Sequence, residues 1–574
     1  MKKIQVIVFL NIAAIVLSCN PGKQPADVVI LGGTIYTVND KQPTVESVVV
    51  NGDKITYAGN EQEARTWIGD STTVIDLQGR IMTPGFIEGH GHLMGVGFNE
   101  LDLDLMTVTS FEEIVERVRV AASKAKPGQW ILGRGWHQDK WTTKPSDMVK
   151  GFPSHTSLSK ASPDNPVFLS HASGHMSLAN AKAMEIAGVN QLSVESLNRN
   201  SGEGGEIIRD EHGNPTGLFN ENAEDIINKV IPQSDEGRYL QAFDLAMKAC
   251  HRNGITSFHD AGQSPGQGRR VIEFLKKLRS EGKLSVRLYV MITGWDRDLV
   301  HEWLKNGVEV DPDHWLTIRS IKLNCDGALG SRGAWLIEPY TDRADFFGMA
   351  TLSMDTVLST SREALKAGFQ VCSHAIGDRA NREILDRYET AFTENPEVKD
   401  PRFRIEHAQH LHPNDIPRFG QLGVIPAMQA IHMSSDRPWA IDRLGEKRIK
   451  EGAYMWQSLL KSGAKIVNGT DAPVEQLNPI PSFYASVTRM TLKGEPTGRY
   501  EPEEKMTRDQ ALRSYTLDAA YGAFEENIKG SIEPGKLADF TIFSSDIMTV
   551  PDMDILKSEV MMTIVGGKVV FEKK

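Results

Sequence analysis

The sequence predicts an α/β fold: a TIM-type (β/α)8 barrel with a long insertion after its first strand, plus a small β-sandwich domain formed by both chain ends. Two patterns predict it. Apolar, strand-like runs recur through the middle of the chain, and each ends in polar residues before a segment of helical length. Short runs rich in β-branched residues occupy both ends, and neither end has enough strands to bury an apolar face alone.

Length and composition limit the class of protein. The chain has 574 residues, which is too long for one simple domain. Its 40% hydrophobic and 24% charged residues are ordinary for a globular protein. A formal net charge of -11 disfavours a general nucleic-acid binder, because such proteins need a basic surface. We therefore expect a globular body with no nucleic-acid partner.

The amino terminus resembles an export signal. Lys2 and Lys3 precede an apolar run over 4–17, which is short for a membrane span but fits a signal peptide. The run ends Val-Leu-Ser-Cys19, which resembles the bacterial lipobox, so residues 1–19 are predicted to be a lipoprotein signal peptide with lipidation at Cys19. This predicts an exported bacterial lipoprotein on the periplasmic or cell-surface face of a membrane. The alternative is a plain signal peptide with a chance cysteine.

The next elements are the two halves of the β-sandwich. Residues 26–80 alternate β-branched residues with turns, and 530–574 return to the same pattern. We expect these segments to form one composite domain. Two unrelated terminal additions are the weaker alternative, since each segment has few strands.

The barrel is expected over 81–529, with an insertion at about 98–250 that covers its mouth. The insertion contains one further strand-like run, at 167–171. Eight runs predict the barrel strands: 83–90, 255–260, 286–291, 318–326, 369–374, 403–407, 424–429 and 465–471.

Five polar side chains stand where barrel strands end: His90, His92, His374, His407 and Asp471. Active sites of TIM barrels lie at the carboxyl ends of the strands, so these residues are expected to converge. Imidazole and carboxylate ligands suit zinc, iron, manganese, nickel or cobalt, and zinc is favoured here. Each histidine alone could be an ordinary core residue. Their joint placement on strand ends predicts a divalent metal site.

Lys322 lies inside the fourth apolar run, where an unpaired ammonium would be costly to bury. A salt bridge to a neighbouring carboxylate is one explanation. The remaining cysteines, Cys250, Cys325 and Cys372, are widely spaced and predict neither a disulfide framework nor a cysteine-rich zinc site.

The segment 83–92, Thr-Pro-Gly-Phe-Ile-Glu-Gly-His-Gly-His, resembles the signature of the amidohydrolase superfamily. A finer resemblance, to exported relatives of N-substituted formamide deformylases, rests on motifs at 130–136, 171–175, 322–332, 373–378, 404–409 and 469–473. Two departures affect the pocket floor: Glu88-Gly89 replaces the usual Asp-Ser or Asp-Thr, and 323–325 reads Leu-Asn-Cys.

The resemblance implies the role of each ligand. His90 and His92 would hold a first metal, and His374 and His407 a second. Lys322, carboxylated by carbon dioxide to a carbamate, would bridge them, so the site holds one ion or two. Asp471 would contact metal and shuttle a proton.

With these ligands, the resemblance implies a metal-dependent hydrolase of carbon–nitrogen bonds other than peptide bonds, of the amide or N-substituted formamide type, in a small-molecule substrate. A metal-activated water would attack, and Asp471 would pass its proton to the leaving nitrogen. The same ligands would serve a heterocycle deaminase. A surface binding lipoprotein without catalysis is the alternative from another class.

Five further residues are candidates for substrate contact. His171 and His175 lie in the insertion and are otherwise turn residues with local hydrogen bonds. Asp326 and Arg332 follow Lys322, and they either orient substrate or pair with each other; a structural role is an equal alternative for Arg332. His432 reaches the mouth only if its segment folds inward.

Overall fold

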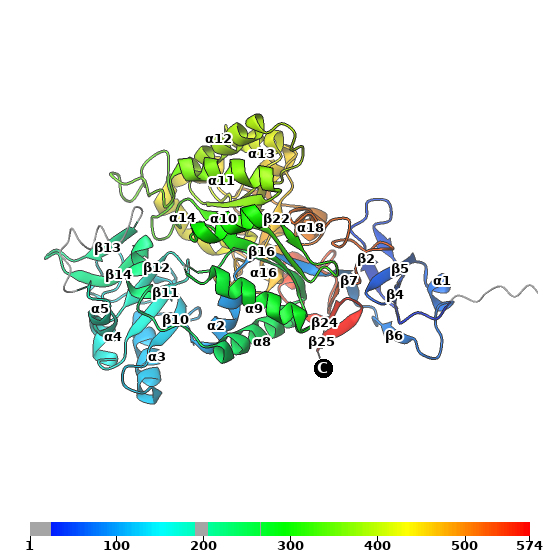
Figure 1. Cartoon of the computed structure of the whole chain (residues 1–574), viewed down its shortest axis with the longest axis horizontal. Helices are drawn as coiled ribbons and strands as arrows, with labels where there is room; N and C mark the ends of the chain where they lie inside the picture. The colour runs from blue at the N-terminus through cyan, green and yellow to red at the C-terminus, as the bar shows by residue number, and fades with distance from the viewer. Residues whose placement is uncertain (1–23, 190–204, 265, 574) are drawn as a thin grey trace, which may run out of the picture.

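The computed structural model describes residues 24–189, 205–264 and 266–573. Three parts follow one another along its long axis: a sheet with helices built by the insertion, the barrel, and a pair of sheets at the amino-terminal end (Figure 1). The predicted signal peptide and Cys19 lie outside the described residues. Within the described ranges, no helix combines the length and apolar character needed to cross a membrane.

The central part is a barrel of parallel strands, which confirms the predicted fold class. The strands are hydrogen-bonded in chain order and the last meets the first, since Asp471 N donates to His90 O at 2.8 Å and His92 N to Ala472 O at 2.7 Å. A short strand, β17 (Glu309–Val310), adds to β18 antiparallel. The eight barrel strands are β8 (Phe86–Gly91), β15 (Ile255–Asp260), β16 (Arg287–Thr293), β18 (Leu316–Asn324), β19 (Gln370–Ala375), β20 (Arg404–His407), β21 (Ile425–Met428) and β22 (Val467–Asn468).

Helices connect the strands and cover the barrel. Several begin at a side-chain cap, such as Asp235, which accepts from Arg238 N at 2.8 Å. The helices around the barrel are α2 (Leu93–Leu101), α8 (Glu236–Arg252), α9 (Gly268–Ser280), α10 (Arg297–Asn306), α11 (Met354–Ala367), α12 (Asp378–Glu394), α13 (Ile416–Leu422), α14 (Ala430–Gly452), α15 (Trp456–Lys461), α16 (Pro479–Thr488), α17 (Arg508–Ser514) and α18 (Leu517–Tyr521).

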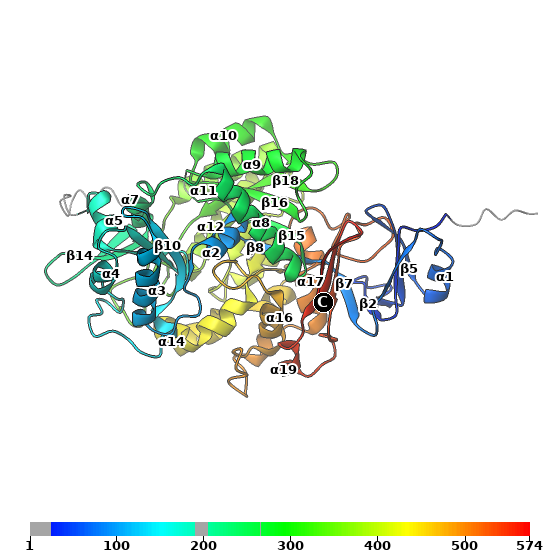
Figure 2. The same ribbon diagram turned by 90° about the horizontal axis from the view of Figure 1, so that it is seen from below.

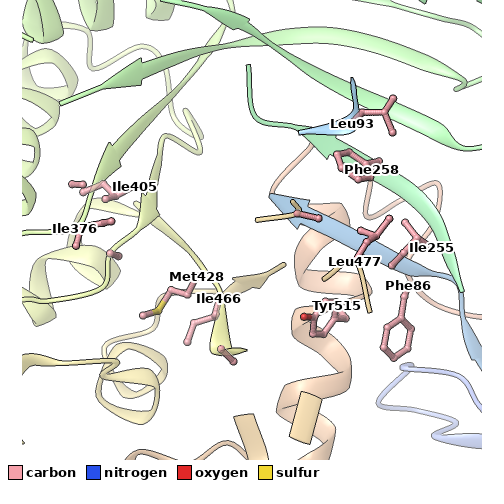
Figure 3. Close-up of a cluster of buried hydrophobic side chains, with 14 of the residues drawn as sticks. Phe86, Leu93, Ile255, Phe258, Ile376, Ile405, Met428, Ile466, Leu477 and Tyr515 are labelled. Atoms are coloured by element: carbon pink, nitrogen blue, oxygen red, sulfur yellow. The ribbon is translucent and has the colours of Figure 1, made fainter. Parts of the chain in front are cut away.

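One large apolar cluster contains most of the buried apolar side chains of the barrel, and two small ones hold others. Figure 3 shows side chains of four barrel strands within the large cluster: Phe86 of β8, Ile255 of β15, Ile405 of β20 and Met428 of β21. Phe86 also stacks on Tyr515 of α17–α18, with ring centroids 5.3 Å apart. This packing holds the strands in register beneath the polar residues at their ends.

The run predicted over 83–90 divides between two sheets. β7 (Ile81–Pro84) pairs with a carboxyl-terminal strand, whereas β8 enters the barrel. The chain changes sheet at Gly85, where a Cβ atom would lie 2.2 Å from the Thr256 hydroxyl oxygen. Glycine is needed here because the backbone approaches β15 too closely for any side chain.

Two sheets built from both chain ends pack on a shared core that includes Ile30, Ile55 and Phe540. One has the order β5-β4-β1-β6 and the other β25-β24-β23-β7-β2-β3, and Figure 2 shows the red carboxyl-terminal strands next to β7. Their elements are β1 (Val28–Leu31), β2 (Thr34–Tyr36), β3 (Thr44–Val45), β4 (Ser47–Asn51), β5 (Lys54–Gly59), α1 (Glu61–Arg65), β6 (Thr73–Asp76), β23 (Phe540–Phe543), α19 (Asp552–Ile555), β24 (Val560–Val565) and β25 (Lys568–Glu572).

The insertion has more structure than the single predicted strand. It forms a six-stranded sheet of order β13-β14-β12-β11-β10-β9, with apolar clusters of its own. Its short strands carry glycines and polar residues, so their alternation is weak in the sequence. Its elements are β9 (Leu103–Asp104), α3 (Phe111–Lys124), β10 (Ile131–Trp136), α4 (Thr156–Ala161), β11 (Val167–His171), β12 (Met176–Ala179), α5 (Ala181–Ile186), β13 (Gly205–Arg209), β14 (Pro215–Glu221) and α7 (Asp225–Asn228).

Candidate metal centre

The structure brings the predicted ligand residues together at the carboxyl ends of the barrel strands. The ring of His407 lies 4.8 Å from that of His90 and 4.4 Å from that of His374, between centroids. Asp471 Oδ1 lies 3.5 Å from His90 Nε2 and 3.4 Å from His92 Nε2. Four imidazoles and one carboxylate therefore face one small volume.

Three of these histidines are held by hydrogen bonds at Nδ1, on the side away from the centre. His90 contacts the Glu406 carboxylate, His407 contacts Gln429 Oε1 at 2.7 Å, and His92 contacts Gly262 O at 3.2 Å. Protein histidines that bind metals usually have their second nitrogen engaged in this way. The arrangement directs their Nε2 atoms at the centre.

Several atoms at the centre are buried and lack partners. Among the described residues, His90 Nε2, His374 Nε2 and Asp471 Oδ1 have no hydrogen-bond partner, although Asp326 Oδ1 lies 3.5 Å from His374 Nε2. Ligand atoms of His90, His407 and Asp471 lie within 4.8 Å of one another. Buried polar atoms are normally satisfied, and nitrogen and oxygen donors converging without a thiolate fit a divalent cation.

The electrostatics match the protonation states that metal ligands need. Burial lowers the pKa of His90 to about 4 and also takes the pKa of His374 and His407 well below the usual value. Burial opposes ionisation of Asp471, but the nearby imidazoles of His90 and His92 outweigh it and hold its pKa well below the usual range. The site thus combines neutral imidazoles with a carboxylate.

Lys322 lies in β18 and is buried, with Nζ donating to Ala261 O at 3.3 Å. Of the described carboxylates, none lies within 4 Å of Nζ, so the salt bridge considered from the sequence is not formed. Burial lowers the pKa of this amine. It is therefore a buried amine beside the ligand cluster without a counter-ion.

The backbone at two ligand positions is unusual. His407 has φ of 74° and Asp471 has φ of 57°, and Ala408 has φ of 43°. Left-handed conformations are unfavourable for residues with a side chain and often persist at functional sites. Here they turn the side chains at the ends of β20 and β22 into the barrel mouth.

A pocket enclosing about 540 Å³, counting its open mouth, lies over the centre. Its floor includes His374, His407 and Asp471, and its walls come from both the barrel and the insertion. The lining is His137, Lys140, Ala172, Ser173, His175, Ala328, Leu329, Gly330, His374, Ile376, His407, Gln409, His432, Asp436, Trp439, Asp471, Val474 and Glu475.

Two predicted substrate residues line this pocket. His175 lies against His374, with ring centroids 4.9 Å apart, and His432 stacks on His407 at 6.3 Å. Asp326 lies under the floor, where it accepts from the backbone of Ile376 at 3.0 Å. Burial raises the pKa of Asp326 to about 7.

The other two lie outside the lining. His171 is bound within the insertion, to Ser173 Oγ at 2.8 Å and Gln138 Oε1 at 3.1 Å. Arg332 pairs with Asp342 at 2.8 Å and not with Asp326, because its loop turns it away from the floor. This geometry agrees with the alternative in which His171 is a turn residue with local hydrogen bonds. It also agrees with a structural role for Arg332.

Three residues near the ligand histidines were not predicted from the sequence: Glu406, Asp436 and Trp439. Glu406 contacts His90 and accepts from Arg404 Nε at 2.7 Å. It directly precedes His407 in the chain. Asp436 and Trp439 line the pocket from α14, and a charged and an aromatic residue on one helix gave no distinct signal. The position of Glu406 next to His407, a predicted ligand, was the one sequence feature that could have identified any of these residues.

The sequence pattern of the Amidohydrolase family matches residues 73–571. The chain is 34% identical over 551 residues to Protein LONG AFTER FAR-RED 3 of Arabidopsis thaliana, covering 95% of this chain and 91% of that one. It is 25% identical to the N-substituted formamide deformylase of Arthrobacter pascens, covering 96% and 99%. A solved structure of an uncharacterized metal-dependent hydrolase from Pyrococcus furiosus is similar with a TM-score of 0.69 and 28% identity, covering 91% of this chain and all of that one.

Proposed function

The chain belongs to the amidohydrolase family, and from that premise we propose that it hydrolyses carbon–nitrogen bonds of small amides or N-substituted formamides. Membership of the family makes it a metal-dependent hydrolase. The likeness to an N-substituted formamide deformylase along nearly the whole chain supports the choice of bond. The observation that carries the proposal is the set of unpartnered buried atoms on His90, His374 and Asp471 beneath a pocket.

His90, His92 and Asp471 would hold one cation, zinc by ligand preference, and His374 with His407 a second. A divalent cation there supplies Lewis acidity and makes water a better nucleophile near neutral pH. Lys322 would join the two as a carbamate, which is supported by its burial without a counter-ion. A carbamate would convert a costly buried amine into an anionic oxygen ligand.

Asp471 is placed to move the proton. Its Oδ1 atom is buried at the floor of the pocket without a hydrogen-bond donor among the described residues, and its low pKa keeps it ionised, the form that can accept a proton. It would take the proton of the attacking water and return it to the leaving nitrogen. The apolar walls at Leu329, Ile376 and Val474 would keep bulk water from the reacting bond.

The first test is metal content by elemental analysis, with bicarbonate in the buffer, for wild type and Lys322→Ala. We expect about two metals per chain in wild type and fewer in the variant, as a bridged pair requires. Lys529→Met is the matched control: Lys529 is also buried but pairs with Glu525 at 2.7 Å and should leave metal content unchanged. No bound metal in wild type would contradict the proposal.

A panel of amides and N-substituted formamides then tests the bond. Release of an amine with a carboxylate or formate supports the proposal, whereas release of ammonia from heterocycles would assign the site to deamination. Bound metal without turnover of any substrate would favour a binding protein.

The signal-like run and Cys19 support a further proposal, export with a lipid anchor at a bacterial membrane. Mass spectrometry of the amino-terminal peptide from the membrane fraction tests it. We expect a lipid-modified Cys19, and a Cys19→Ala variant released from the membrane. An unmodified or uncleaved amino terminus would contradict it.

A further inference from the structure

Glu221 is a buried carboxylate of the insertion that has no role in the hydrolytic mechanism proposed above. It ends β14, and its side chain is 3% exposed. Its Oε2 atom contacts His175 Nδ1 at 2.8 Å, and its backbone N–H donates to His175 O at 2.9 Å. Glu221 therefore holds both the ring and the backbone of His175.

The barrel makes room for this carboxylate. Gly327 and Gly333 lie in the loop after β18, and a Cβ atom would lie 1.9 Å or 2.2 Å, respectively, from Glu221 Oε1. Neither glycine has a left-handed φ, so a side chain at either position would conflict with the Glu221 carboxylate and not with the backbone conformation. The glycine-rich stretch from Asp326 to Gly333 thus leaves space for the Glu221 side chain of the insertion.

Glu221 also has a strained backbone, with φ of 51°. Such a conformation in a residue other than glycine is kept where the surroundings impose it, often at functional sites. Among the described residues, the buried Glu221 carboxylate pairs with one basic side chain, that of His175. Its Oε1 atom receives no hydrogen bond from them. These features converge on the orientation of one imidazole.

That imidazole faces the metal centre. His175 lines the pocket, and its ring contacts that of His374 at 4.9 Å between centroids. Since Nδ1 is bound to Glu221, Nε2 is the nitrogen left for a ligand in the pocket. The pair repeats the arrangement of His90 with Glu406, but it comes from the insertion and not from the barrel.

We propose that His175 is a catalytic residue supplied by the insertion, contacting the reacting amide through Nε2, and that Glu221 is the positioning residue that orients it. The inference rests on the proposed function, because it concerns the same pocket. The insertion is then part of the active site and does more than cover it.

The test is a double-variant cycle with Glu221→Gln, His175→Gln and both together, each in the metal-loaded protein. His175→Gln should lower kcat about 100-fold, and Glu221→Gln about 10- to 100-fold through misplacement of the ring. If Glu221 acts through His175, adding Glu221→Gln to His175→Gln should change kcat by no more than about twofold. KM and metal content should stay near their wild-type values.

Glu206→Gln is the matched control, because Glu206 lies in the neighbouring strand of the same sheet and its ion pairs with described residues are those with Lys150 and Arg343 near the surface. Gly327→Ala is a second perturbation that moves the carboxylate and leaves its charge in place. It should reproduce the loss of kcat. Independent, multiplying effects of the two single variants, or loss of metal in His175→Gln, would overturn the inference.

Calorimetric binding of acetohydroxamate to the zinc-loaded protein separates this inference from the proposed function. Weaker binding in both single variants, with no further loss in the double variant, supports the contact by His175 even if no amide is cleaved. Unchanged binding and unchanged kcat in both would refute it, whatever bond the wild type hydrolyses.

Discussion

Glu406→Gln separates the two roles that the structure gives to Glu406. Its carboxylate contacts His90 Nδ1 and accepts from Arg404 Nε at 2.7 Å and Nη2 at 2.9 Å, and both Glu406 and Arg404 are fully buried. Losing the charge behind His90 should weaken metal binding about 10- to 100-fold, or about 1.4–2.8 kcal/mol. Leaving Arg404 without its anion should lower the free energy of unfolding by about 3–5 kcal/mol.

Metal affinity is measured by competition with a chromophoric chelator, and stability by urea unfolding of the metal-free protein. Glu525→Gln is the control: Glu525 pairs with Lys529 at 2.7 Å in a similarly buried setting, beside Thr317 at the start of β18. It should lose stability and keep its metal affinity. Wild-type affinity in Glu406→Gln, or an equal loss of affinity in both variants, would refute the reasoning.

Three other predictions follow from the same region. Asp471→Asn should lower kcat about 10²- to 10⁴-fold even when metal fills the site, because the amide cannot accept a proton; an unchanged kcat in steady-state assays would exclude this role. Restoring zinc to chelated protein at 100 times its Kd should raise the free energy of unfolding by about 2.7 kcal/mol, measured by denaturation; no change would mean that zinc does not bind the native state. Burial raises the pKa of Asp436 to about 6, so ionising it opposes folding progressively as pH rises from 3.8 through 6. Asp436→Asn should therefore be more stable than wild type by about 3 kcal/mol above pH 7, with a smaller gain at pH 5 in urea titrations; a gain that grows toward low pH would reverse the sign we assign.

Much of the barrel and its metal centre could be predicted from local pattern. Eight apolar runs with polar ends mark strands whatever surrounds them, and parallel strands in a closed barrel bring all those ends to one mouth. For that reason His90, His374, His407 and Asp471 could be grouped although as many as 381 residues separate them in the chain. The first strand was less regular, because Gly85 transfers the chain from one sheet to another and the apolar run does not reveal the change.

Contacts between elements distant in sequence had no such local signal. The partner of Arg332 is Asp342 because of how the loop after β18 folds, and nearness to Asp326 in the chain says little about it. The sheet of the insertion likewise gains its stability from packing among short strands whose periodicity is weak.

The sequence by itself determined the barrel strands and the polar residues at their ends, because residue type and periodicity are local properties, and its resemblance to amidohydrolases predicted these residues as metal ligands. Only the tertiary structure decided which residues stand behind the ligands and which face them. Glu406 behind His90, and Glu221 seated against Gly327 to aim His175, depend on a carboxylate being buried beside one particular imidazole. Such a pairing depends on how whole helices and strands pack, and a single sequence does not reveal that packing.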